Sequence, residues 1–131
     1  MPKTVLMIED NPNNAMLVRR ILEANAIHVS HAWDGESGLQ MAMEQQPDLI
    51  LLDLGLPDVD GQTIAAIIRR VPELEHVPMI AVTAWPEETG REMVRAYGCD
   101  DYIPKPINSK TFLKIVLSYL NRTANAVTPA S

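Results

Sequence analysis

The stretch Leu49-Ile50-Leu51-Leu52-Asp53 decides the fold of this 131-residue chain. Four consecutive large apolar residues run into a carboxylate, between Pro47 and a loop that contains Pro57. A short apolar run bounded by turn residues is typical of a strand that helices bury on both faces of a parallel sheet. Because ligands bind outside the carboxyl ends of such strands, we expect Asp53 to lie at a functional edge.

Three other apolar segments end in the same way. They lie at residues 5–8, at residues 79–82 and, more weakly, at residues 99–103. The polar residues that follow them are Glu9, Asp10, Thr83 and Lys105. Since the carboxyl ends of parallel strands meet at one edge of a sheet, three acids, a hydroxyl and an ammonium group are expected to lie together there.

Helical patterns alternate with the expected strands along the chain. We expect strands at residues 4–9, 28–31, 48–53, 79–83 and 99–103, and helices at about residues 12–25, 35–46, 61–70, 86–98 and 109–120. Asn11 and Pro12 suit an N-cap and a first helical position, whereas Asn25 and Gly98 suit left-handed stops. Such alternation predicts an α/β fold of parallel strands joined by right-handed crossovers.

The length of the chain fits one domain. We expect residues 1–121 to form that domain. Residues 123–131 are small, polar and aperiodic, so residues 122–131 are expected to be a flexible tail.

The composition argues against several partners. The net charge is −6 and the pI is about 4.9, which disfavours binding to nucleic acid or to an anionic membrane surface. No apolar stretch is long enough to span a bilayer, and the amino terminus lacks the pattern of a signal peptide. Cys99 is the single cysteine, so we expect no disulfide and a cytoplasmic location.

The expected cluster of acids has a definite chemistry. Crowded carboxylates repel one another unless a proton or a cation lies between them. A set of oxygen ligands favours Mg²⁺ over zinc, and the three histidines are not expected to be ligands. A carboxylate beside Mg²⁺ can attack phosphorus, and Lys105 and Thr83 can stabilise charge on the phosphoryl oxygens. The residues therefore indicate phosphoryl transfer.

Together these residues resemble the receiver domain of two-component response regulators. The matching residues are Glu9-Asp10, Asp53 with Pro57 and Gly61, Thr83-Ala84, and Lys105-Pro106. The resemblance covers roughly residues 3–121. It implies a doubly wound, flavodoxin-like sheet of five parallel strands in the order 2-1-3-4-5, with five helices.

The resemblance also implies a role for each residue. Asp53 would accept a phosphoryl group from a phosphohistidine of a sensor histidine kinase or a histidine phosphotransfer protein. The implied Mg²⁺ ligands are Glu9, Asp10, Asp53 and the backbone carbonyl of Gly55. Thr83 and Lys105 would contact the phosphoryl oxygens, and the Lys105–Pro106 peptide bond would be cis.

A switch in shape follows from the same resemblance. Tyr102 would move inward as Thr83 follows the phosphoryl group. This movement would change the surface made by the fourth helix, the fifth strand and the fifth helix, where a downstream protein binds. The chain would then be a single-domain signalling module that assists its own phosphorylation and dephosphorylation, and not an enzyme with a separate substrate.

Two other interpretations fit the residues less well. A phosphatase of the haloacid dehalogenase type needs a second acid two residues after its nucleophile, where this chain has Gly55. A flavin or nucleotide binder needs a glycine-rich loop after the first strand, and none follows it. Within the receiver interpretation, an effector and an intermediate of a phosphorelay both remain open. Trp85 and Pro104 are unusual for a receiver, as is the lack of a side chain at Gly55.

Overall fold

The computed structural model describes residues 2–54 and 61–127. Its five strands form one parallel sheet in the order β2-β1-β3-β4-β5. The strands are β1 (Thr4–Ile8), β2 (His28–Ala32), β3 (Leu49–Asp53), β4 (Met79–Thr83) and β5 (Asp101–Pro104). The helices are α1 (Pro12–Glu23), α2 (Gly35–Gln45), α3 (Gly61–Arg70), the 3₁₀ turn η1 (Pro72–Leu74), α4 (Glu87–Ala96) and α5 (Ser109–Val127). The predicted fold class and strand order are confirmed.

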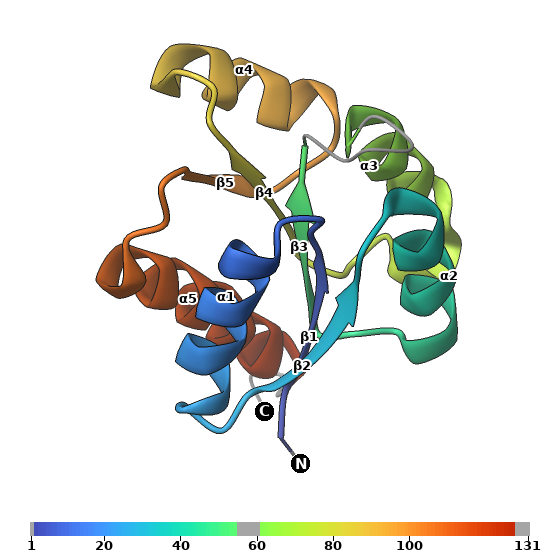
Figure 1. Cartoon of the computed structure of the whole chain (residues 1–131). Coiled ribbons are helices and arrows are strands. Elements are labelled where there is room, and N and C mark those ends of the chain that lie inside the picture. The colour runs from blue at the N-terminus through green and yellow to red at the C-terminus, as the bar shows by residue number, and fades with distance from the viewer. Residues whose placement is uncertain (1, 55–60, 128–131) are drawn as a thin grey trace.

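The sheet separates two apolar layers because successive side chains of a strand point to opposite faces. On one face, β1 and β3 contribute Val5, Met7, Leu49 and Leu51, which pack with residues of α1 and α5 such as Leu22 and Phe112. On the other face, Leu6, Ile8, Ile50 and Leu52 pack with residues of α2 and α3 such as Ala42 and Ile64. Figure 1 shows α1 and α5 together on one side of the sheet and α2 and α3 on the other. Both faces of the sheet are therefore covered.

The ends of the first helix agree only in part with the prediction. The Asn11 side chain accepts hydrogen bonds from the backbone N–H groups of Asn13 (2.9 Å) and Asn14 (3.1 Å), so its predicted role as N-cap is confirmed. The left-handed residue after α1 is Ala26, with φ 62°, and not Asn25. Asn25 uses its side-chain amide to donate to the Ile21 carbonyl instead (2.8 Å), which satisfies one of the last carbonyls of the helix.

Two segments are more helical than expected. Residues 72–74, predicted as part of a connecting loop, form η1. The last helix continues to Val127, beyond the expected domain boundary at residue 121. Residues 121–127 include two alanines and neither glycine nor proline, so nothing in their composition stops the helix. The domain boundary itself stays a prediction.

Candidate functional site at the carboxyl edge of the sheet

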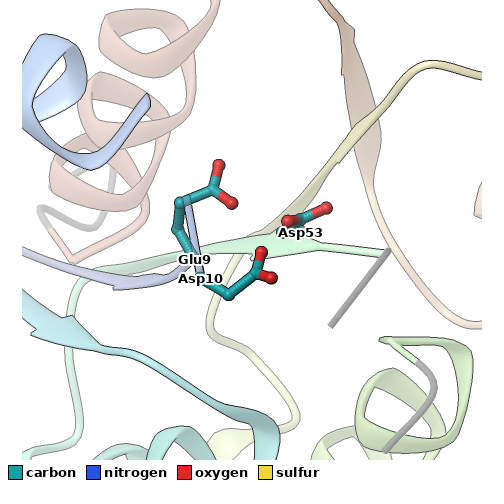
Figure 2. A group of neighbouring side chains, drawn as sticks. All are labelled: Glu9, Asp10 and Asp53. Atoms are coloured by element: carbon teal, nitrogen blue, oxygen red, sulfur yellow. The ribbon is translucent and has the colours of Figure 1, made fainter. Parts of the chain in front are cut away.

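The pairing of β1 with β3 brings the acids together. Ile8 is the register partner of Leu52, so Glu9 and Asp10 follow β1 at the level where Asp53 ends β3. The ligand oxygens of these three carboxylates lie within 4.8 Å of one another. Figure 2 shows the three side chains gathered at this edge, two following β1 and one at the end of β3.

The pairing of the next two strands adds the hydroxyl and the ammonium group. Asp53 pairs with Val82, so Thr83 ends β4 one residue beyond it. Thr83 pairs with Pro104, and Lys105 follows. The backbone N–H of Lys105 donates to the Thr83 carbonyl (2.9 Å), and its Nζ donates to Asp53 Oδ1 (3.0 Å). The Lys105–Pro106 peptide bond is cis.

Three of the polar side chains at the site are buried. Glu9, Asp53 and Thr83 are each only 3% exposed, whereas Asp10 is more accessible. Such burial disfavours the ionised form of a carboxyl group unless a partner compensates. The ion pair with Lys105 provides one partner for Asp53.

Glu9 shows the electrostatic cost of this crowding. The pKa of Glu9 is raised from 4.5 to about 8, chiefly by burial and also by the hydrogen bond with Asp53 and the negative charge of Asp53. Lys105 and the backbone N–H of Asn11 act in the opposite direction. Below this pKa, a proton on Glu9 separates two carboxyl groups that would otherwise repel each other. A divalent cation could replace that proton.

Thr83 has a backbone partner that the sequence did not suggest. Its Oγ1 accepts a hydrogen bond from the backbone N–H of Trp85 (3.0 Å). This bond ties the hydroxyl to the segment that leads into α4. Any contact that draws the Thr83 hydroxyl toward Asp53 therefore competes with, or pulls on, the start of that helix.

Tyr102 lies on β5 against α4. It is only partly buried, and it packs at the edge of the apolar layer that also contains Val94. A Cβ placed on Gly90 of α4 would lie 3.4 Å from two carbons of the Tyr102 ring. The ring thus covers the glycine in the middle of α4, and a movement of Tyr102 would uncover it.

The structure explains why residue 61 is a glycine. Gly55, the predicted source of a carbonyl ligand, lies outside the described residues. Gly61 begins α3 directly behind the end of β3, and a Cβ there would lie 2.8 Å from the backbone oxygen of Asp53. A side chain at residue 61 would therefore displace the end of β3.

Sequence reasoning missed the contacts of His31 at this edge and a set of bonds made by Arg69 at the opposite, amino edge of the sheet. His31 Nε2 lies 2.9 Å from the backbone oxygen of Glu9, and the His31 ring packs on Trp33 with centroids 4.2 Å apart. Arg69, at the end of α3, is bonded to several loops. No pattern of spacing predicts the contact of His31 with Glu9 or that of Arg69 with Gly98, because each joins residues that are distant in sequence.

Comparison with known proteins identifies the family. A model of the response regulator receiver domain matches residues 5–117. The chain therefore belongs to the response regulator receiver family. It is a signalling module of the two-component and phosphorelay type, as the resemblance in the sequence predicted.

Individual relatives agree over almost the whole chain. The polar-differentiation response regulator DivK of Brucella anthropi is 40% identical over 120 residues, which are 92% of this chain and 98% of DivK. The DivK protein of Brucella ovis is 39% identical over the same shares. The similarity thus extends well beyond the site residues.

Solved structures show the same fold. A putative response regulator from Chloroflexus aurantiacus superposes with a TM-score of 0.88 at 26% identity, over 92% of this chain and 99% of that one. The receiver domain of the sensor histidine kinase PA1611 from Pseudomonas aeruginosa superposes with a TM-score of 0.84 at 30% identity, over 92% and 99%. That structure contains a magnesium ion in its active-site cleft.

Proposed function

We propose that Asp53 is the residue that accepts the phosphoryl group. The observation that carries this proposal is the placement of one buried carboxylate 3.0 Å from Lys105 and within 4.8 Å of two other acids. A carboxylate is a competent nucleophile toward phosphorus when nearby cations offset the charge of the phosphoryl oxygens. The phosphohistidine of a sensor kinase or a phosphotransfer protein is the donor that the family implies.

The residues present fit Mg²⁺. Glu9, Asp10 and Asp53 offer only oxygen atoms, and the raised pKa of Glu9 indicates that its ionised form lacks a sufficient positive partner. These three side chains, with the carbonyl of Gly55, would hold the ion. When bound, Mg²⁺ would neutralise the acids and the phosphoryl oxygens. Lys105 would offset the remaining negative charge on the phosphoryl oxygens, and the Thr83 hydroxyl would donate a hydrogen bond to one of them.

Thr83 would couple phosphorylation of Asp53 to a change in the position of α4 and Tyr102. The Thr83 hydroxyl is bonded to Trp85 in the segment just before α4, and Tyr102 covers the middle of that helix. Movement of Thr83 toward the phosphoryl group would change how Tyr102 packs. The surface formed by α4, β5 and α5 would then bind its protein target differently.

The chain would work in the cytoplasm. Among residues 2–54 and 61–127, no helix has the length and apolar character needed to cross a bilayer. Burial raises the pKa of Cys99 to about 11, which disfavours the reactive thiolate form of this side chain. The acidic net charge of −6 agrees with protein partners and not with nucleic acid.

Labelling with a small phosphodonor tests the first proposal. Acetyl phosphate with Mg²⁺ should add one phosphoryl group to the wild-type protein, and hydroxylamine should remove it. Asp53→Asn should take up none, and neither should the wild type in EDTA. Asp34→Asn is the matched control, because asparagine can keep the N-cap bond of Asp34 to Ser37. Undiminished labelling of a folded Asp53→Asn would overturn the proposal.

Phosphotransfer profiling identifies the donor. Purified histidine kinases and phosphotransfer proteins of the source cell would be phosphorylated on histidine and mixed with this chain. A cognate donor should lose its label to Asp53 within seconds to minutes, whereas Asp53→Asn should leave it phosphorylated. If a phosphotransfer protein also receives the label back from this chain, the chain is a relay intermediate. If no such return occurs and a target binds the phosphorylated chain, it is an effector.

A further inference from the structure

Arg69 is bonded through its whole side-chain head group. A guanidinium carries five N–H donors, and the five bonds of Arg69 run to four backbone carbonyls and one carboxylate. The acceptors are Leu74 O (3.2 Å), Glu75 O (3.0 Å), Val77 O (3.0 Å), Gly98 O (2.6 Å) and Asp100 Oδ2 (2.8 Å). We call this set the Arg69 clamp. The Arg69 side chain is 19% exposed, so solvent screens these bonds less than those of a surface arginine.

The Arg69 clamp joins the end of α3 to the segment that follows it and to a turn that is distant in sequence. Arg69 belongs to the last turn of α3, and its acceptors lie in and after η1 and in the turn between α4 and β5. Asp100 extends the clamp to a fourth segment, because the same Oδ2 accepts the backbone N–H of Met79 at the start of β4 (2.8 Å). Lysine could not replace these contacts, since it lacks the planar fork of donors.

Gly98 packs so closely against Arg69 that there is no space for a side chain at residue 98. Its φ of 81° is in the left-handed region, which favours glycine. A Cβ at this residue would lie 2.6 Å from Arg69 Cγ. The turn that follows α4 is therefore held by a short hydrogen bond to its carbonyl and by direct packing on its Cα.

The rest of α4 is held much less firmly. Among its side chains that the structure describes, Gly90 and Val94 are buried and the others are exposed or partly exposed. The ion pair of Glu87 with Arg91 has side chains that are 66% and 70% exposed, and such pairs contribute little stability. A helix with few buried contacts opens or shifts more easily than the core. Figure 1 shows α4 at the margin of the molecule, apart from the pair formed by α1 and α5.

We propose that Arg69 is a positioning residue that makes the turn at Gly98 the fixed pivot of α4. A change at Thr83 would then displace the amino half of α4 and Tyr102, while the carboxyl end of the helix stays in place. The proposal rests on the proposed function only in that Thr83 responds to a group on Asp53. It adds a residue 14 positions before Thr83 that determines which part of the output surface moves.

The pivot can be tested on the full chain with beryllofluoride and Mg²⁺, which mimic an aspartyl phosphate. Hydrogen exchange and backbone chemical shifts would be measured along α4 for wild type, Arg69→Gln and Arg69→Lys. Arg70→Gln is the matched control, because Arg70 is the neighbouring residue of the same helix and is exposed. In the wild type and the control, beryllofluoride should shift residues 84–92 strongly and residues 95–98 weakly.

Arg69→Gln should change the distribution of these shifts. Without beryllofluoride, amide exchange at residues 94–99 should rise by about tenfold, the factor equivalent to ~1.4 kcal/mol, which is near the lower end for hydrogen bonds to charged groups. With beryllofluoride, the shifts should spread to residues 95–100. Arg69→Lys should show an intermediate spread, because it keeps only a point charge near Asp100.

Two results would overturn the pivot. One is a lowered melting temperature of Arg69→Gln with the distribution of shifts unchanged, which would leave Arg69 a purely structural role. The other is unchanged exchange at residues 94–99. If Arg69→Gln does not fold, Arg69→Lys and Asp100→Asn give the same comparison with a smaller loss. If beryllofluoride shifts nothing near Asp53 in the wild type, the proposed function fails, whereas the exchange experiment still decides whether the clamp holds α4.

Discussion

The interior of the sheet and its carboxyl edge are buried to the same degree but hold opposite kinds of side chain. Residues 49–52 of β3 are apolar and at most 1% exposed, whereas Asp53, Glu9 and Thr83 at the edge are polar and 3% exposed. Burial of apolar groups stabilises the fold, and burial of polar or charged groups costs stability unless they are fully paired. The comparison indicates that the core stabilises an edge that is unfavourable by itself, because the edge is arranged for binding and chemistry.

The largest effect that would sharpen this comparison is the pH dependence of the metal-free protein. Between pH 4.5 and about 8, the folded state holds a proton on Glu9 that the unfolded state has released. The contribution of Glu9 to the free energy of unfolding should therefore be constant below pH 4.5. It should decrease as the pH rises from 4.5 to about 8. Each pKa unit is worth about 1.4 kcal/mol, so this is the largest change expected from one residue here. Urea denaturation in EDTA at several pH values measures it.

Two additions test the cause of that pH dependence. Glu9→Gln should flatten the curve, since it cannot release a proton. Mg²⁺ should raise the stability of the wild type most at high pH, because an ion that binds only the folded state stabilises it by mass action. A wild-type curve with no decline in this range, or an equal decline in Glu9→Gln, would show that Glu9 does not limit stability at the edge.

In the interior, removal of Phe112 should cost the next largest amount. Phe112 of α5 is fully buried at 0% exposure and packs in the same apolar layer as Leu49 and Leu51. Phe112→Ala should destabilise the protein by about 3–5 kcal/mol, the usual range for such a change in a core. Met16→Ala, at a residue that is 58% exposed, should change stability by less than about 0.5 kcal/mol. Equal losses for the two variants would contradict the role assigned to this layer.

At the edge, a smaller loss of stability than that of Phe112→Ala is expected for a change at Thr83. Thr83→Val keeps the shape of the side chain but removes the oxygen that accepts the Trp85 N–H, which should cost about 1–3 kcal/mol. Thr83→Ser keeps the hydroxyl and is the matched control. Despite this modest loss, Thr83→Val should still accept phosphate at Asp53 but bind its phosphorylation-dependent partner weakly.

The measurements for Thr83 are denaturant unfolding and partner binding with and without acetyl phosphate. If Thr83→Val distinguishes the phosphorylated state as well as Thr83→Ser does, the hydroxyl does not transmit the signal. The buried hydroxyl of Thr83 would then contribute to the stability of the edge but not to signalling.

Much of the fold and most of the candidate site could be predicted from the sequence. The apolar run into Asp53 is a local pattern, and the alternation of strands and helices then requires parallel strands whose carboxyl ends meet. This alone places Glu9, Asp10, Thr83 and Lys105 at one edge, because each lies at the end of a strand or within two residues after it. Such properties depend on residue type and spacing, which a sequence contains in full.

Only the tertiary structure decided how these groups are paired. The pKa of Glu9 depends on the distance to Asp53 and on burial by segments from elsewhere in the chain. The Arg69 clamp depends on two connecting segments that meet because α3, β4 and β5 pack as they do. The left-handed residue after α1 is Ala26 because Asn25 bonds to the helix end instead. Each of these features depends on which groups lie within bonding distance of one another. The sequence gives the identity of those groups but not the distances between them.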